Sequence, residues 1–328
     1  MSVVATKVYD AANRLMDNDR RKAGPAHAGH AFAFVAWIAF IVPYAEAQTS
    51  TYSAEPCRLL KDMVNDNWSV LVSQPGNYCF AQDLHQSWPL FRLPHQPVPM
   101  GPLLNINSNN VIIDLKNHKL TARGSEDRGE GVWHGSTYSR PSPRITIKNG
   151  FIATSTLPTV FLTYRWNNEN HRFGDRQYKI ALSNGDLSQY RPTEFILENL
   201  TLEADNHVIV MQGMNNIIRN CKIVGGNGTV NIYGPNLIFE NNEIILKAKD
   251  TAAANGEAPV ALYLEDSADS VVRNNHITVK GNAANVSAVA LKNSPNVILT
   301  GNTVSGTKDL YKLLDADSTV KASENKLN

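Results

Sequence analysis

Two long segments of the chain concentrate aromatic and basic side chains of the kind that bind sugar chains. Aromatic rings stack on the apolar face of a pyranose, and Arg pairs with a uronate carboxylate through parallel hydrogen bonds. A solvated surface position is the alternative interpretation of the Arg residues. The substrate-binding residues predicted on this basis are Trp133, Arg165, Trp166, Arg172 and Arg176.

The same segments hold acidic and histidine side chains that predict catalysis. Hydrolysis of a glycosidic bond uses two carboxyl groups, whereas elimination beside a uronate needs a base such as Lys, Arg, His or Tyr. The sequence fixes no distance between these groups, so lyase and hydrolase chemistry both stay open, and a surface histidine is the alternative for each His. The candidate catalytic residues are Asp127, His134, His171 and Asp175.

These residues belong to insertions in an otherwise regular chain. Loops on a rigid scaffold are where binding residues concentrate, and long loops in a compact domain are usually functional or disordered. The three predicted insertions are residues 85–102, 123–143 and 153–192.

A sequence repeat supplies the scaffold. A short alternating strand is followed by a polar residue, Asn, two variable residues and Ile, Leu or Val. The recurring position falls at Asn117, Asn149, Asn199, Asn220, Asn241, Asn274, Gly301 and Glu324, with spacings of 32, 50, 21, 21, 33, 27 and 23 residues. Such a repeat predicts stacked coils that bury a continuous core only together. Stacked Asn side chains are expected to hydrogen-bond the backbone of the next coil without the repulsion of stacked charges. This explains why 35 of the 328 residues are Asn.

The repeat resembles the right-handed parallel β-helix of the pectate-lyase-like superfamily. The resemblance implies an all-β, right-handed parallel β-helix over residues 67–328, and residues 57–66 have the apolar spacing of a short N-terminal capping helix within a leader at 48–66. The catalytic motifs of pectate lyases, polygalacturonases and alginate epimerases are missing, so no catalytic set is carried over to this chain.

Strand alternation predicts two outward columns on the repeat strands. One is charged, and catalytic carboxylates or a structural charge ladder both explain it. The other is apolar, and either strand preference for β-branched residues or an interface explains it. The charged column is Lys116, Lys148, Glu198, Arg219, Glu240, Arg273 and Thr300. The apolar column is Asp114, Thr146, Ile196, Ile217, Ile238, Val271 and Ile298.

The first 47 residues read as a secretory signal peptide, with basic residues, an apolar stretch at 31–45 and the A-x-A sequence at 45–47. An uncleaved anchor is the alternative, and the sequence leaves open whether translation starts at Met1 or at Met16. Export predicts a periplasmic or secreted protein without a membrane span in the mature chain, and an oxidising compartment. There Cys57 and Cys79 are expected to pair, while Cys221 stays buried and free.

The net charge of +1, without a long Lys/Arg run, argues against nucleic-acid binding. No cofactor is predicted, although Ca²⁺ stays open. The sequence therefore favours an exported protein that binds or processes an extracellular or cell-envelope polysaccharide. The alternative is a non-catalytic surface or adhesive β-helix protein, or a structural homo-oligomer.

Overall fold

The computed structural model describes residues 56–60, 69–87, 101–123, 130–137, 142–155, 157–165, 192–226, 228–248, 259–281 and 286–328. All of them belong to one compact unit, Ala54–Asn328. Their regular structure is almost entirely β-strand, and these residues contain no α-helix. The part of the chain that the structure describes accordingly has no helix long and apolar enough to cross a membrane.

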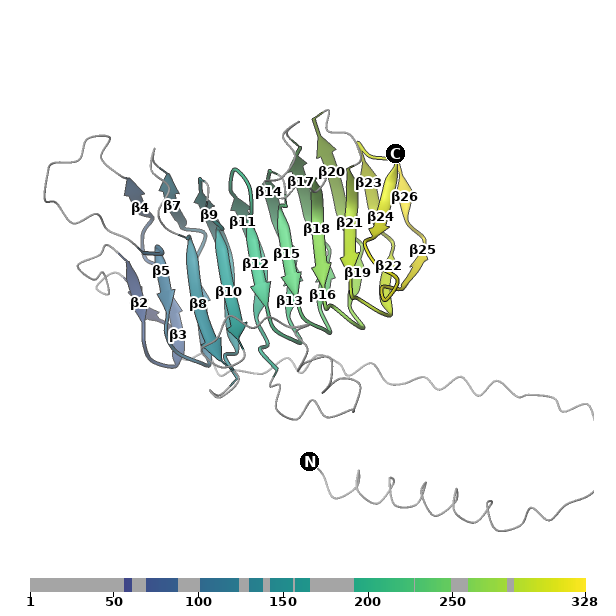
Figure 1. The fold of residues 1–328 in the computed structure, drawn as a ribbon. Helices are drawn as coiled ribbons and strands as arrows, with labels where there is room; N and C mark the ends of the chain where they lie inside the picture. Colours follow the sequence, from purple (N-terminus) through teal and green to yellow (C-terminus); the bar gives the residue numbers. More distant parts are fainter. Residues whose placement is uncertain are drawn as a thin grey trace, which may run out of the picture. The chain divides into compact units, whose positions relative to one another are not determined.

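Strands of successive coils lie side by side along the solenoid (Figure 1). They form a nine-stranded and a 17-stranded parallel sheet. We call the nine-stranded sheet sheet B. Its strands are β2 (Val70–Val72), β5 (Leu104–Ile106), β8 (Val132–Thr137), β10 (Val160–Arg165), β12 (Ile209–Gln212), β15 (Val230–Tyr233), β18 (Val260–Glu265), β21 (Ser287–Lys292) and β24 (Asp309–Leu313).

The 17-stranded sheet consists of two adjoining parts, which we call face A1 and face A2. Its longest strands belong to both parts, because their first half pairs with one set of strands and their second half pairs with another. Face A1 contains β1 (Arg58–Leu59), β3 (Gly76–Cys79), β6 (Val111–Asp114), β9 (Ile145–Thr154), β11 (Ile196–Glu203), β13 (Ile217–Arg219), β16 (Ile238–Glu240), β19 (Val271–Arg273), β22 (Val297–Thr300) and β25 (Val320–Ser323). Face A2 contains the second halves of β9 and β11 with β4 (Leu84–Ser87), β7 (Lys119–Arg123), β14 (Lys222–Gly225), β17 (Glu243–Lys247), β20 (His276–Lys280), β23 (Thr303–Ser305) and β26 (Lys326–Leu327).

The chain visits sheet B, face A1 and face A2 in turn, so each coil adds one strand to each. Equivalent strands of successive coils lie about 4.8 Å apart. This arrangement confirms the predicted all-β solenoid.

Apolar side chains of successive coils stack inside the solenoid. One inward column of face A1 has no exposed member: Ile113, Ile147, Leu197, Ile218, Phe239, Val272 and Leu299. The predicted outward positions of Asp114 and Lys116 imply that Leu115 begins this inward column, but the register gives that position to Ile113. Leu115 and Lys116 are two extra residues at the corner. Leu115 is also buried there. Its Cβ lies only 2.4 Å from the position that a Cβ would take at residue 150, which explains the glycine at that position.

The recurring Asn position is a corner where the backbone is left-handed. The φ angles at Asn117, Asn149, Asn199, Asn220, Asn241 and Asn274 lie between 53° and 64°. Asn tolerates this conformation better than most residues, which explains its recurrence. Some of these side chains bond to each other, as Asn199 Nδ2 does to Asn149 Oδ1 at 3.2 Å.

The ladder that satisfies the backbone lies one residue further on. Asn242, Asn275 and Asn302 are buried, and their backbone N–H groups donate to the Oδ1 atoms of Asn275, Asn302 and Asn325 at 2.9, 3.0 and 2.9 Å. Their amide nitrogens donate to carbonyl oxygens of the face A1 strand one coil earlier, at Ile218, Phe239 and Val272. The predicted Asn ladder therefore exists, but the buried residues that follow the predicted Asn positions form it.

The N-terminal coil differs from its prediction. Arg58 and Leu59, expected in the capping helix, form the strand β1 and pair with Tyr78 and Cys79. Residues 61–68 lie outside the described residues. The predicted disulfide between Cys57 and Cys79 is confirmed, and it fastens the chain before β1 to the end of β3. Cys221 is buried and free, also as predicted.

Strands also run through two of the predicted insertions. β8 lies within residues 123–143, and β10 lies within residues 153–192. Both are regular members of sheet B, paired with each other and with β5 and β12. Their alternating apolar residues, such as Val132 and His134 inward with Trp133 outward, are those of a strand that covers one side of a core.

Candidate functional site

Three of the nine predicted site residues lie in strands of sheet B. Trp133 and His134 are in β8, and Arg165 is the last residue of β10, paired with Thr137. The other six predicted residues lie outside the described residues: Asp127, Trp166, His171, Arg172, Asp175 and Arg176.

His134 points into the solenoid. It is 5% exposed, its Nδ1 lies 2.7 Å from the Ile106 carbonyl oxygen, and its ring meets the Phe195 ring edge-on at 5.8 Å. The alternation of β8 explains this placement, since His134 follows the outward Trp133. The ring therefore contributes to the interior of the coil rather than to an outward surface.

Trp133 lies on the outer side of sheet B. A Cβ built on Gly135, two residues along the same strand, would lie 2.9 Å from two atoms of the Trp133 six-membered ring. The indole thus lies over the glycine, close to the backbone. The next residue in its column is Phe161, and both side chains are half-buried. Together they form an aromatic surface on β8 and β10.

Further along sheet B, a polar and aromatic cluster surrounds one carboxylate. We call Tyr233, Tyr263, Glu265 and Lys292 the tyrosine cluster. The Tyr263 hydroxyl donates to Glu265 Oε2 at 2.8 Å, and Lys292 Nζ lies 3.0 Å from Glu265 Oε1. The Tyr233 and Tyr263 rings meet edge-on at 6.1 Å. Each oxygen of Glu265 is therefore held in a fixed direction beside two aromatic rings.

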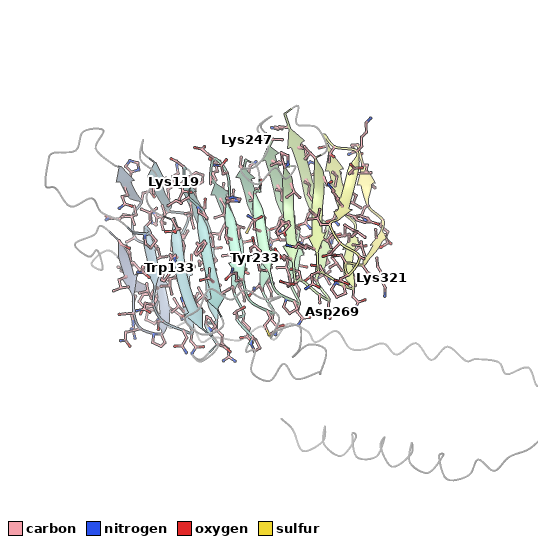
Figure 2. All side chains as sticks on the ribbon, viewed as in Figure 1. Lys119, Trp133, Tyr233, Lys247, Asp269 and Lys321 are labelled. Atoms are coloured by element: carbon pink, nitrogen blue, oxygen red, sulfur yellow. A yellow bond between two sulfur atoms is a disulfide. The ribbon has the colours of Figure 1, made fainter. Side chains whose placement is uncertain are left out.

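The register explains how these side chains meet. Glu265 is the direct neighbour of Tyr233 on β15 and of Lys292 on β21. Tyr263 precedes Glu265 by two residues and shares its outward side. Figure 2 labels Trp133 and Tyr233 on this same sheet. From β8 to β18 there are four strand steps, about 19 Å along the solenoid.

A histidine and an asparagine lie near the beginning of the neighbouring strands β12 and β15, between Phe161 and Tyr263. His207 Nδ1 lies 2.8 Å from Asn231 Nδ2 and 2.8 Å from the Gly228 carbonyl oxygen. Asn231 is the register neighbour of Tyr263. The His207 imidazole is exposed and adds a hydrogen-bonding group to this surface, whereas the Asn231 amide beside it is buried.

The charged column of face A1 consists of paired side chains. Arg219 binds Glu198 at 2.6 Å, and Arg273 Nε binds Glu240 at 2.7 Å. The register begins this column at Asp114 rather than at Lys116, because the extra corner residues shift the first coil by two. Pairing between neighbouring coils favours the structural interpretation of this column over the catalytic one.

Asp114 and Cys221 at the corner between faces A1 and A2 both have shifted pKa values. Partial burial favours the neutral form of Asp114. Hydrogen bonds from the Lys116 N–H and the Asn149 amide, with the Lys116 charge, nevertheless keep the pKa of Asp114 below its ordinary value. Burial raises the pKa of the Cys221 thiol to about 12. Among the described residues, no group of three or more His, Cys, Asp or Glu side chains is arranged to hold a metal ion.

The comparison with protein families identifies the fold. A family described as "Right handed beta helix region" matches residues 163–327, half of the chain. The chain belongs to this right-handed β-helix family. The curated proteins contain no match to the chain. The solved structures contain none either.

The sequence reasoning missed the tyrosine cluster. Its residues lie in regular strands and not in the predicted insertions. One signal was available: in the segment 260–265 the outward positions carry Tyr263 and Glu265, whereas most outward residues of the repeat are aliphatic or charged. Two polar aromatic residues on successive coils of the same sheet favour a binding surface.

Proposed function

We propose that this β-helix is an exported protein that binds an extracellular or cell-envelope polysaccharide across the outer side of sheet B. The observation that carries the proposal is the tyrosine cluster, in which two half-buried aromatic rings flank a carboxylate with fixed hydrogen-bond partners. Aromatic rings give apolar contact to a sugar ring, and the carboxylate and ammonium offer acceptors and donors for its hydroxyl groups.

The spread of aromatic residues supports a chain-like ligand. Trp133 on β8 and Tyr263 on β18 lie about 19 Å apart along the solenoid, and Phe161 and Tyr233 lie on strands between them. A single sugar would touch one group, whereas an oligosaccharide running along the solenoid axis would touch both. The disulfide between Cys57 and Cys79 supports export, because such bonds persist in oxidising compartments.

Binding to uronate-containing and neutral polysaccharides tests the proposal. Calorimetry or a glycan array should detect binding by the purified protein. Trp133→Ala and Tyr263→Ala should each weaken it about tenfold, the usual effect of one aromatic contact. Phe151→Ala is the matched control, since Phe151 is a half-buried aromatic residue on face A2.

Two conservative variants separate the parts of the site. Gly135→Ala keeps Trp133 but pushes its ring away from the backbone, so it should weaken binding while the fold is retained. Tyr263→Phe keeps both rings but removes the hydrogen bond to Glu265, so it should change the preference among sugars more than the overall affinity. Binding of every variant as tight as that of the wild type, or no binding to any polysaccharide, would contradict the proposal.

Processing of the bound chain is the second part of the function to be tested. Asp127, His171 and Asp175, with Trp166, Arg172 and Arg176, remain the predicted residues for it. The same polysaccharides should be followed for unsaturated products, which a lyase releases, and for new reducing ends, which a hydrolase releases. Turnover lost in Asp127→Asn or Asp175→Asn, with binding retained, would support catalysis by these residues.

A further inference from the structure

Face A1 presents three outward columns of side chains. The charged column is complementary to the same column read in the opposite direction. The charged column reads Asp114, Lys148, Glu198, Arg219, Glu240 and Arg273 in register, with the sign changing at every step. Read backwards, the same column has a base wherever the forward reading has an acid.

An aliphatic stripe runs beside the charged column. It contains Ile112, Thr146, Ile196, Ile217, Ile238, Val271 and Ile298. These side chains remain partly exposed, and Ile298 reaches 36%. A contiguous apolar stripe rimmed by polar residues is typical of an interaction surface.

We propose that face A1 binds a second copy of this chain. The two copies are related by a two-fold axis that runs parallel to the strands and passes between β11 and β13. This operation keeps each column opposite itself and reverses its order. Glu198 then faces Arg219 of the second copy, Lys148 faces Glu240, and Asp114 faces Arg273. Every acid of the column meets a base.

The other two columns tolerate the same arrangement. In the aliphatic stripe, Ile196 faces Ile217, Thr146 faces Ile238, and Ile112 faces Val271. The third column lies at the corner and includes the exposed ion pair between Arg144 and Glu194. There Glu194 faces Asn215, Arg144 faces Asn236, and Asn110 faces Asp269, so no two like charges meet. This third agreement is independent of the first two.

The available area suits a dimer. The axis relates the strands from β3 to β22 in pairs, and three outward columns about 7 Å apart over these eight strands give a surface roughly 20 Å wide and 38 Å long, or roughly 770 Å². A stable protein interface buries about 800 Å² on each partner. Parallel solenoid faces are flat enough to pack against each other in the way that two sheets do.

The wild-type protein should have the mass of two chains in sedimentation or light scattering, and high salt should weaken the dimer. Ile217→Lys places a charge in the middle of the stripe and should give a monomer. Ile245→Lys is the matched control, because Ile245 is a half-buried outward residue of face A2. It should remain a dimer.

A charge swap distinguishes this interface from any other. Glu198→Lys should weaken the dimer at least tenfold by placing like charges opposite each other. The double variant Glu198→Arg/Arg219→Glu restores both the ion pair within the chain and the pairing across the axis, so it should dimerise with itself. Mixed with wild type, it should form no heterodimer, because two glutamates and two arginines would then face each other.

The outcomes separate cleanly in native mass spectrometry of the mixture. Two homodimers without the heterodimer support the proposal. A heterodimer formed in the statistical proportion, or a wild-type protein with the mass of one chain at the highest soluble concentration, overturns it. Circular dichroism of each variant checks that the fold is retained, so a monomeric variant reports on the interface rather than on unfolding.

Discussion

The buried Asn ladder predicts a large loss of stability from one substitution, Asn275→Ala. The Asn275 side chain takes part in four hydrogen bonds. Its Oδ1 accepts from the backbone N–H and the side-chain amide of Asn242, and its Nδ2 donates to the Phe239 carbonyl and to Asn302 Oδ1. Alanine removes all four and leaves a buried N–H and a buried carbonyl without these partners.

The expected loss of stability follows from the number of hydrogen bonds that the substitution removes. A hydrogen bond contributes about 1 kcal/mol net, and an unsatisfied buried group costs about 1–3 kcal/mol. The loss for Asn275→Ala should therefore be about 4 kcal/mol. Because a domain is stable by only about 5–15 kcal/mol, the variant should unfold at a much lower urea concentration.

Urea unfolding followed by circular dichroism measures this effect. Asn274→Gly is the matched control, because it removes the neighbouring exposed side chain and keeps a residue suited to the φ of 55° there. Gly301 already occupies the equivalent corner of the next coil. The control should change stability by less than about 0.5 kcal/mol. If Asn275→Ala changed it no more than the control, the ladder would not stabilise the solenoid as argued.

Three further effects should be measurable. The pKa of about 12 makes the Cys221 thiol unreactive toward thiol reagents at pH 8 until the protein unfolds in urea, so rapid labelling of the folded protein would contradict its burial. Hydrogen bonds from Ser318 and the Asn293 N–H lower the pKa of Asp315 below its ordinary 3.8, despite some burial that raises it. The ionised Asp315 carboxylate therefore stabilises the fold above pH 3.8, and this stabilisation is lost as the pH falls through the lowered pKa. The melting temperatures of wild type and Asp315→Asn should accordingly converge in acid. The disulfide between Cys57 and Cys79 closes a sequence separation of 22 residues, so its removal should cost about 3 kcal/mol, measured by urea unfolding of the double Ser variant.

The repeat made the solenoid predictable, because stacked coils impose the same requirement on the same position of each coil. The left-handed corner selected Asn at positions such as Asn220 and Asn241, and this recurrence is visible in the sequence. The inward Asn column was harder to place, because Asn241 and Asn242 are adjacent and the repeat does not say which one points inward. The left-handed residue bends the chain at the corner between faces A1 and A2, and the Asn242 side chain lies in the core beyond this bend.

The candidate site was less predictable, because it does not recur from coil to coil. β8 and β10 lie in segments that the sequence predicts as insertions, because these segments interrupt the Asn-containing repeat and sheet B carries no such recurring residue. The tyrosine cluster depends on register between strands separated by loops of different length, as Tyr233, Glu265 and Lys292 do. Coil spacings that range from 21 to 50 residues give no such register in advance.

Ion pairs between neighbouring coils occur on each face of the solenoid, so an ion pair alone does not mark a site. Glu198 with Arg219 on face A1 and Lys222 with Glu243 on face A2 resemble Glu265 with Lys292 on sheet B in length and exposure. What distinguishes the last pair is its surroundings. On face A1 the adjacent column is aliphatic and suits a protein surface of the same kind. On sheet B the Tyr263 hydroxyl binds the carboxylate, and the adjacent ring of Tyr233 is polar at its tip and apolar on its face. A ligand that is itself apolar on one side and rich in hydroxyl groups at its edges matches sheet B better than a second protein does. The two faces therefore favour different partners. On each face, the side chains beside the ion pairs determine which kind of partner surface can exclude water there.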